Sequence, residues 1–229
     1  MRIAIIVFPG SNCDRDMMVA VETITGRRPA LIWHKQSNLD PIDLAIIPGG
    51  FSFGDYLRCG ALAAHAPIMN ALHDHAARGG PILGICNGFQ ILIESGMLPG
   101  FLARNNELKF ICKQTTLSVN ADSNCELLSS LDSKNILKIP IAHNEGNFFA
   151  DAETLNNIEN NGQVVLRYTA DRDGNLGNPN GSLNDIAGIC STNGKILGMM
   201  PHPERAIGEG HESSDGRKFL QSIFEAVTA

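Results

Sequence analysis

The most restrictive feature of the chain is the segment from Pro81 to Leu92, which reads Pro-Ile-Leu-Gly-Ile-Cys-Asn-Gly-Phe-Gln-Ile-Leu. The apolar residues before Cys86 are typical of a buried strand, and those after it fit a helix. Gly84 and Gly88 are small enough to let the backbone fold back at the cysteine. The segment therefore predicts a strand, a sharp turn and a helix, with a thiol held at the edge of a sheet.

A thiol in this position is suited to covalent chemistry. The unpaired N–H groups and the positive dipole end at the start of a helix favour the thiolate. We therefore take Cys86 as the candidate nucleophile. The remaining cysteines form no C-x-x-C pair, and we interpret them as small buried hydrophobes or incidental thiols in a reducing compartment. They are Cys13, Cys59, Cys112, Cys125 and Cys190.

Composition limits the classes of protein that fit. With 229 residues, 43% of them hydrophobic, the chain is long enough for one large core, and we predict a single domain over residues 1–229. The net charge is −6 and there is no basic run, which argues against nucleic acid or an anionic membrane as partner. Neither a signal peptide nor a membrane-spanning apolar stretch is evident, so we predict a cytoplasmic protein.

The histidines carry no zinc signature. His73 and His75 form a weak pair in a predicted helix, where we expect a solvated face. We therefore predict no metal site.

The first half of the chain alternates short apolar strands with helical patterns. Continuous apolar strands joined by helices predict a doubly wound, mostly parallel α/β sheet covered on both faces. Ligands bind such sheets beyond the carboxyl ends of the strands, where Gly49, Gly50 and Cys86 all fall. We expect strands over 2–8, 30–34, 44–47 and 81–85, a turn with a helix cap over 9–12, and helices over 13–24, 61–78 and 87–96.

The second half is less regular and favours antiparallel additions to the parallel core. Strand-like runs are separated by turns rich in Asn, Asp, Gly and Ser, such as residues 175–182. A helix over 216–227 carries one apolar stripe, which predicts docking on the core in preference to binding a partner. The expected strands cover 108–119, 136–142, 163–168, 185–190 and 195–200.

A thiol nucleophile needs a base, and the base needs an orienting group. His202 and Glu204 follow an apolar strand late in the chain, and residues two apart in an extended segment point the same way. Prolines on both sides of His202 would hold the pair stiffly. A purely structural hydrogen bond is the alternative, but the elbow cysteine in the same chain favours a catalytic pair.

Acyl chemistry also needs donors for an oxyanion. One candidate is the backbone amide of Asn87, directly after the nucleophile. The other comes from the turn at Gly49, Gly50 and Phe51, which should lie beside the elbow at the same sheet edge. A plain turn is the alternative for this second segment.

These residues carry a resemblance to a known family. Residues 84–90 together with 201–204 resemble the class I glutamine amidotransferases, which have a flavodoxin-like fold and a Cys-His-Glu triad. Residues 8–16, 49–61 and 178–182 are similar to one branch, the glutaminase subunits of phosphoribosylformylglycinamidine synthase. One departure is visible, because His-Asn-Glu-Gly at 143–146 replaces the usual His-Gly-Glu-Gly. Asn tolerates a left-handed backbone well, so the turn is expected to survive.

The resemblance implies that glutamine is the substrate. Cys86 would attack the side-chain amide, His202 would move the protons, and Glu204 would orient the imidazole. The oxyanion would be held at Gly50 and Asn87. Substrate-binding roles are implied for Phe51, Gln90 and His143, with a helix-packing amide as the alternative for Gln90.

The resemblance also implies partners. Ammonia would pass to a separate synthetase subunit, which uses ATP and magnesium to make formylglycinamidine ribonucleotide from formylglycinamide ribonucleotide in purine biosynthesis. A small third subunit would join the complex. No cofactor is expected in this chain, which has no phosphate-binding loop. The alternatives are a glutaminase serving another acceptor, an elbow-cysteine redox or stress protein, and a catalytically silent scaffold.

Overall fold

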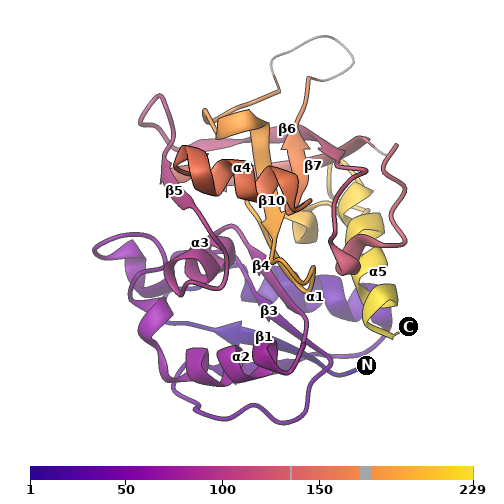
Figure 1. The fold of residues 1–229 in the computed structure, drawn as a ribbon. Helices are drawn as coiled ribbons and strands as arrows, with labels where there is room; N and C mark the ends of the chain where they lie inside the picture. The colour runs from indigo at the N-terminus through magenta and orange to yellow at the C-terminus, as the bar shows by residue number, and fades with distance from the viewer. Residues whose placement is uncertain (135, 171–176, 229) are drawn as a thin grey trace.

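A computed structural model describes residues 1–134, 136–170 and 177–228. The first half follows the expected alternation of strands and helices, coloured indigo to magenta in Figure 1. Its elements are β1 (Ile3–Val7), α1 (Asp14–Thr25), β2 (Ala30–Trp33), β3 (Leu44–Ile47), α2 (Pro67–Ala77), β4 (Ile82–Ile85) and α3 (Asn87–Glu94).

Among the described residues, the second half adds strands and two α-helices. Its elements are β5 (Phe101–Arg104), β6 (Ile111–Val119), β7 (Ile136–His143), β8 (Glu145–Phe149), α4 (Ala152–Asn160), β9 (Val164–Tyr168), β10 (Ile186–Cys190), β11 (Ile196–Met199) and α5 (Asp215–Thr228).

One large sheet has the strand order β2-β1-β3-β4-β11-β10-β9-β6-β7. The pairs from β2 through β1, β3 and β4 to β11 are parallel, and those from β11 through β10, β9 and β6 to β7 are antiparallel. The predicted doubly wound α/β sheet with antiparallel additions is therefore confirmed. In the parallel part, Ile47 pairs with Gly84 and Ile85 with Met199, so the carboxyl ends of β3, β4 and β11 meet at one edge.

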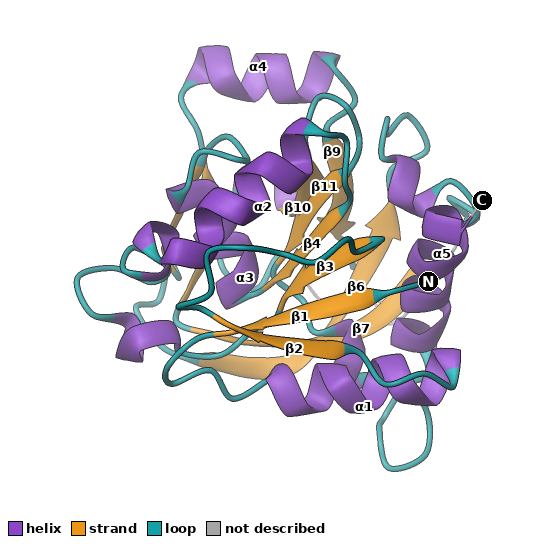
Figure 2. Cartoon of the chain, turned by 90° about the horizontal axis from the view of Figure 1, so that it is seen from below, coloured by secondary structure: helices purple, strands orange, loops and turns teal. Residues whose placement is uncertain are grey.

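Helices cover both faces of the parallel part of the sheet. Figure 2 shows α2 and α3 on one side, and α1 and α5 on the other. The strands β1, β3, β4 and β11 are almost entirely buried, as expected for strands covered on both faces. The predicted apolar stripe of α5 is confirmed as a core contact, since Phe219, Leu220, Ile223 and Phe224 are all buried.

The helix predicted over 61–78 is divided. A short 3-10 turn covers Ala63–His65, Ala66 is extended, and α2 begins at Pro67. Proline disfavours a helical residue before it, which explains the break. The expected solvated face is wrong for His75, which is buried and has Nε2 3.1 Å from the Pro81 carbonyl oxygen.

Some elements were not expected. The strands β5 and β8 form a separate two-stranded sheet. Helix α4 is capped by Asp151, the residue before it, whose carboxylate accepts a 2.9 Å hydrogen bond from the Thr154 amide. The cap expected before α1 is different, because Cys13 occupies that position and makes no capping hydrogen bond through its side chain. The turn predicted over 175–182 begins outside the described residues.

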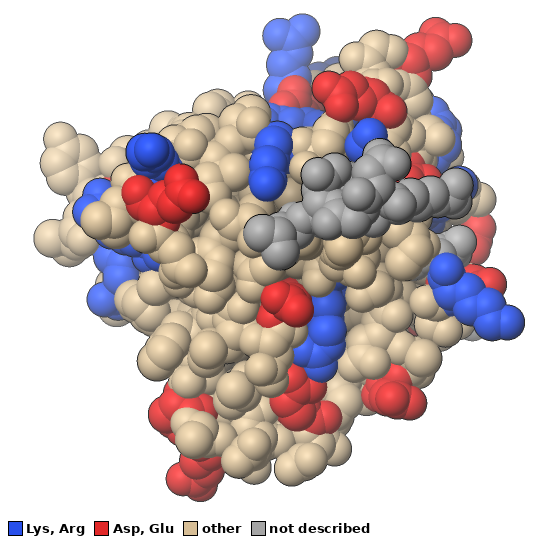
Figure 3. All heavy atoms as spheres, turned by 90° about the horizontal axis from the view of Figure 1, so that it is seen from above, with Lys and Arg blue, Asp and Glu red and all other residues tan. Residues whose placement is uncertain are grey.

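One face of the molecule carries charged side chains of both signs (Figure 3). On the face drawn in Figure 3, acidic and basic side chains are interspersed and form no large patch of one sign. Among the described residues, no helix combines the length and the hydropathy that crossing a membrane requires.

Candidate active site

Cys86 lies at a strained turn between β4 and α3. Its φ of 50° and ψ of −105° are unusual for a residue with a side chain. A Cβ atom at Gly84 would collide with the Leu92 side chain, and one at Gly88 would collide with the Ile47 carbonyl. The two glycines therefore permit the close packing of strand and helix that the sequence predicted.

Strand β11 brings His202 to the elbow. The Cys86 amide donates a 2.7 Å hydrogen bond to the Met199 carbonyl, which joins the elbow to the end of β11. His202 follows three residues later, and its amide donates to the Pro140 carbonyl at 2.8 Å. The Cys86 thiol faces the end of β7, with Sγ 3.7 Å from the Ala142 carbonyl oxygen. The elbow and the ends of β11 and β7 thus meet at Cys86.

His202 and Glu204 form a buried pair. The distance from His202 Nδ1 to Glu204 Oε1 is 2.6 Å, and the side chains are 2% and 1% exposed. The expected extended segment is wrong, because Pro203–Arg205 forms a tight 3-10 turn. The turn still places the two side chains against each other, with His202 preceding it and Glu204 inside it.

The surroundings of His202 favour its charged form. Burial works against the charge, but the Glu204 carboxylate and the neighbouring Cys86 thiol hold the pKa of His202 well above its ordinary value. Within the described residues, His202 Nε2 is buried without a hydrogen-bond partner. The ring therefore has one nitrogen fixed by a carboxylate and the other free for proton transfer.

The turn after β3 lies against this pair, as predicted. A Cβ atom on Gly49 would lie 2.7 Å from His202 Cε1 and 3.3 Å from Cys86 Cβ. Gly50 has a φ of 132°, which L-residues rarely adopt. Phe51 is 44% exposed at the rim. Gly49 thus packs against both Cys86 and His202, at the position where the sequence predicted an oxyanion donor.

Asn87 links the elbow to this turn. It is the first residue of α3, so its backbone amide has no acceptor one turn earlier in the helix. Its side-chain Oδ1 accepts a 3.1 Å hydrogen bond from the Ser52 amide, and its Nδ2 donates to Gln90 Oε1 at 2.9 Å. Asn87 therefore holds the turn in place through its side chain and leaves its amide available.

Gln90 is nearly buried and points toward the segment after β7. Its Nε2 donates a 2.6 Å hydrogen bond to the Glu145 carbonyl. Asp55 completes this group, with Oδ1 3.3 Å from Asn87 Nδ2. Burial, together with the nearby Glu145 charge, raises the pKa of Asp55 above its usual value, although a hydrogen bond from Cys59 opposes the shift.

His143 is held by protein groups on both ring nitrogens. Nδ1 is 3.0 Å from Asn105 Oδ1, and Nε2 is 3.5 Å from Asn180 Nδ2. Burial and the charge of His202 lower the pKa of His143 to about 4. Asn144 does not need a left-handed backbone in this turn, because its φ is not positive. Gly146 is the residue that needs to be small here, since a Cβ would collide with the His143 ring.

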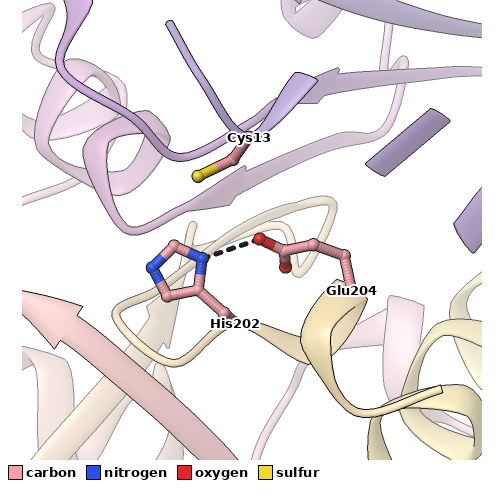
Figure 4. Close-up of side chains that lie close together, drawn as sticks. All are labelled: Cys13, His202 and Glu204. Atoms are coloured by element: carbon pink, nitrogen blue, oxygen red, sulfur yellow. Dashed lines mark hydrogen bonds and ion pairs between the residues drawn. The ribbon is translucent and has the colours of Figure 1, made fainter. Parts of the chain in front are cut away.

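Two further residues of the site were not identified from the sequence. Cys13 was interpreted as an incidental thiol, and Arg205 was not considered. Cys13 Sγ, a ring nitrogen of His202 and a carboxylate oxygen of Glu204 all lie within 4.8 Å of one another. Figure 4 shows the sulfur directed toward the His202–Glu204 pair. Cys13 lies far from His202 and Glu204 in the sequence, so only the three-dimensional structure reveals their proximity.

An elbow thiol beside a buried His–Glu pair, on a doubly wound sheet, is the arrangement of a thiol-dependent enzyme of acyl transfer. The chain belongs to the family described as the CobB/CobQ-like glutamine amidotransferase domain, whose model matches residues 1–226. The resemblance to glutamine amidotransferases noted in the sequence is thereby confirmed.

Individual relatives match over nearly their whole lengths. The phosphoribosylformylglycinamidine synthase subunit PurQ of Trichormus variabilis is 48% identical over 229 residues, covering 100% of this chain and 99% of the relative. The protein of the same name from Chlorobaculum parvum is 50% identical over 227 residues, covering 98% and 89%.

Solved structures agree with the fold. A chain in the structure of PurLQS from Thermotoga maritima has a TM-score of 0.85 and 42% identity, covering 98% of this chain and 97% of that one. A second glutamine amidotransferase from Thermotoga maritima has a TM-score of 0.65 and 14% identity, covering 100% and 99%. This second likeness concerns the fold alone.

Proposed function

We propose that this chain is the glutaminase subunit of a phosphoribosylformylglycinamidine synthase in purine biosynthesis. It hydrolyses glutamine to glutamate and ammonia and delivers the ammonia to a synthetase subunit. That subunit converts formylglycinamide ribonucleotide to formylglycinamidine ribonucleotide with ATP. The observation that carries the proposal is the buried His202–Glu204 pair beside the Cys86 elbow, in a chain that matches subunits of that name over its full length.

The first half-reaction forms a thioester. The Cys86 sulfur attacks the side-chain carbonyl carbon of glutamine, and the negative charge on the oxygen is stabilised by backbone N–H groups at Asn87 and Gly50. The C–N bond breaks as His202 gives its proton to the departing nitrogen, which leaves as ammonia. The raised pKa of His202 supports this role, because the ring carries the proton before ammonia departs.

The second half-reaction restores the enzyme. His202 Nε2 takes a proton from water, which attacks the thioester carbon and releases glutamate. The 2.6 Å contact with Glu204 keeps Nδ1 protonated, so that Nε2 is the nitrogen that exchanges protons. Glu204 also stabilises the charge that the ring acquires.

Gln90, Phe51 and His143 remain our proposed substrate-binding residues. Gln90 lies one helical turn after Cys86 on the same side of α3. His143 is the more indirect of the three, since Asn105 and Asn180 contact both of its ring nitrogens.

Partners and conditions follow from the same proposal. ATP and magnesium belong to the synthetase subunit, and a small third subunit completes the complex. We propose no cofactor or metal for this chain. We place the reaction in the cytoplasm, where the six free cysteines would stay reduced.

Glutamate release from glutamine tests the proposal. It should be weak for the chain alone, strongly stimulated by a synthetase subunit with formylglycinamide ribonucleotide and ATP, and absent in Cys86→Ala. Cys112→Ser is the matched control, because Cys112 is exposed and lies on β6. Undiminished glutamate release by Cys86→Ala would overturn the mechanism. Stimulation only by the synthetase of another ammonia acceptor would favour the alternative acceptor.

A further inference from the structure

The turn between β1 and α1 has no role in the reaction described above, yet it contacts the loop that follows β3. The Phe53 amide donates a 2.6 Å hydrogen bond to the Pro9 carbonyl. Ser11 Oγ donates to the Gly49 carbonyl at 3.3 Å. Residues 8–16, which comprise this turn and the first three residues of α1, are therefore packed against the loop that we propose supplies an oxyanion donor.

The same turn reaches the His–Glu pair through Cys13. Cys13 is 2% exposed, and its sulfur lies within 4.8 Å of the donor atoms of His202 and Glu204. A Cβ on Gly49 would lie 3.3 Å from this sulfur and 2.7 Å from His202 Cε1. The sulfur and the imidazole thus pack beside the same glycine, and Figure 4 shows the sulfur facing the dashed contact between the pair.

Arg205 forms a hydrogen bond with the Cys13 sulfur. Its Nη2 donates to Cys13 Sγ at 3.1 Å, and its Nε donates to Asp16 Oδ2 at 3.1 Å. Arg205 ends the 3-10 turn that contains Glu204, and its amide donates to the His202 carbonyl at 3.1 Å. The guanidinium therefore joins the turn that carries the pair to the start of α1.

The position of Arg205 also affects the charge of Glu204. Glu204 Oε2 is buried without a hydrogen-bond partner among the described residues, which is costly for a carboxylate. The Arg205 guanidinium offsets part of that cost, since it interacts with the charge of Glu204. The stability of the Glu204 charge therefore depends on the positions of His202 and Arg205.

The geometry disfavours a metal site formed by Cys13, His202 and Glu204. Nδ1 and Oε1 are 2.6 Å apart, whereas two ligands of one tetrahedral zinc ion are separated by about 3.4 Å, given metal–ligand distances of about 2.1 Å. The guanidinium on the sulfur would also repel a divalent cation. The cluster fits a positioning role better.

We propose that Cys13 and Arg205 are positioning residues, through which residues 8–16 hold the His202–Glu204 pair in register with Cys86. The inference rests on the proposed function for its kinetic test. The contact from Cys13 also favours the charged imidazole. Loss of either residue should leave glutamine binding intact and weaken the imidazole–thiolate arrangement on which turnover depends.

The first test measures glutamate release by the chain together with its synthetase subunit over a range of pH. Cys13→Ala and Arg205→Met should each lower kcat by about tenfold, with KM changed less than twofold. Cys13→Ser and Arg205→Lys should recover part of the loss, and Cys112→Ser should match the unsubstituted chain. In the double variant Cys13→Ala with Arg205→Met, kcat should fall little further than in the worse single variant, because the two residues act through one contact.

The second test does not require glutamine to be the substrate. Alkylation of Cys86 by iodoacetamide, followed by mass spectrometry of its peptide, reports the thiolate as a function of pH. In Cys13→Ala the rate of alkylation near neutral pH should fall about threefold, because the imidazole is held less well beside the thiol. Unchanged kcat together with an unchanged alkylation profile would overturn the inference, as would lower stability alone. If the unsubstituted chain releases no glutamate, the proposed function fails, and the alkylation profile still decides the role of Cys13.

Discussion

His202 Nδ1 lies 2.6 Å from Glu204 Oε1, and both side chains are almost completely buried. Removing the negative charge while keeping the shape should therefore affect turnover more than binding. Glu204→Gln should reduce kcat by about 10³-fold or more, by analogy with orienting carboxylates in other triads. KM should change much less, because the lost interaction belongs to the charged imidazole.

Steady-state glutaminase kinetics check this expectation. Glu209→Gln is a suitable control, since it removes one carboxylate from an exposed position five residues later. A change confined to KM would identify Glu204 as a binding or structural residue.

The hydrogen bond from the Ser52 amide to Asn87 should be needed to hold the turn at Gly49 and Gly50, the proposed oxyanion donor, in place. Asn87→Ala should lower kcat by about tenfold and the free energy of unfolding by about 1–3 kcal/mol, since the buried Ser52 amide loses its acceptor. Asn87→Asp retains that acceptor but cannot donate to Gln90, and its charge faces Asp55.

Comparing the two Asn87 variants separates these roles. Asn87→Asp should keep more of kcat and lose more of the affinity for glutamine. Equal losses of kcat in both variants would show that the contact with Ser52 does not matter for turnover.

Gly49 should tolerate no side chain. In Gly49→Ala the new Cβ would lie 2.7 Å from His202 Cε1, so the imidazole must move and kcat should fall by about 100-fold. Gly96→Ala is a useful control because it introduces strain at a positive φ, with open space around the new atom. That control should lose about 1 kcal/mol of stability and keep its activity. Full activity of Gly49→Ala in a folded protein would contradict the close packing.

His143 should make the fold sensitive to acid. Its pKa is lowered to about 4 in the folded chain, from an ordinary value of 6.5. Below pH 6.5 His143 binds a proton in the unfolded chain but not in the folded chain. The free energy of unfolding therefore decreases as the pH is lowered from 6.5 to about 4. The lowered pKa corresponds to about 3 kcal/mol over this range.

Urea denaturation at several pH values measures the effect. His143→Gln should show a smaller loss of stability between pH 6.5 and 4, whereas His73→Gln, at an exposed position, should behave like the unsubstituted chain. Identical pH profiles for all three proteins would show that His143 is protonated equally in both states.

The sequence by itself determined the parts of this protein that depend on local patterns. The apolar runs around 44–47, 81–85 and 195–200 indicated strands buried on both faces, and the glycines around Cys86 indicated the elbow. His202 and Glu204 are close in sequence, so their pairing could be inferred, although the turn that joins them could not. The same local patterns carried the likeness to glutamine amidotransferases.

Only the tertiary structure decided which distant residues meet. Cys13 and Arg205 are separated by nearly the whole chain, and neither has a local pattern that predicts a 3.1 Å contact. Sheet order brings the segments after β1, β3, β4 and β11 to one edge, and strand order is set by packing of the whole sheet. The burial of His75 and the contacts of His143 were hidden for the same reason, because a polar side chain can be buried once a distant segment supplies its hydrogen bond.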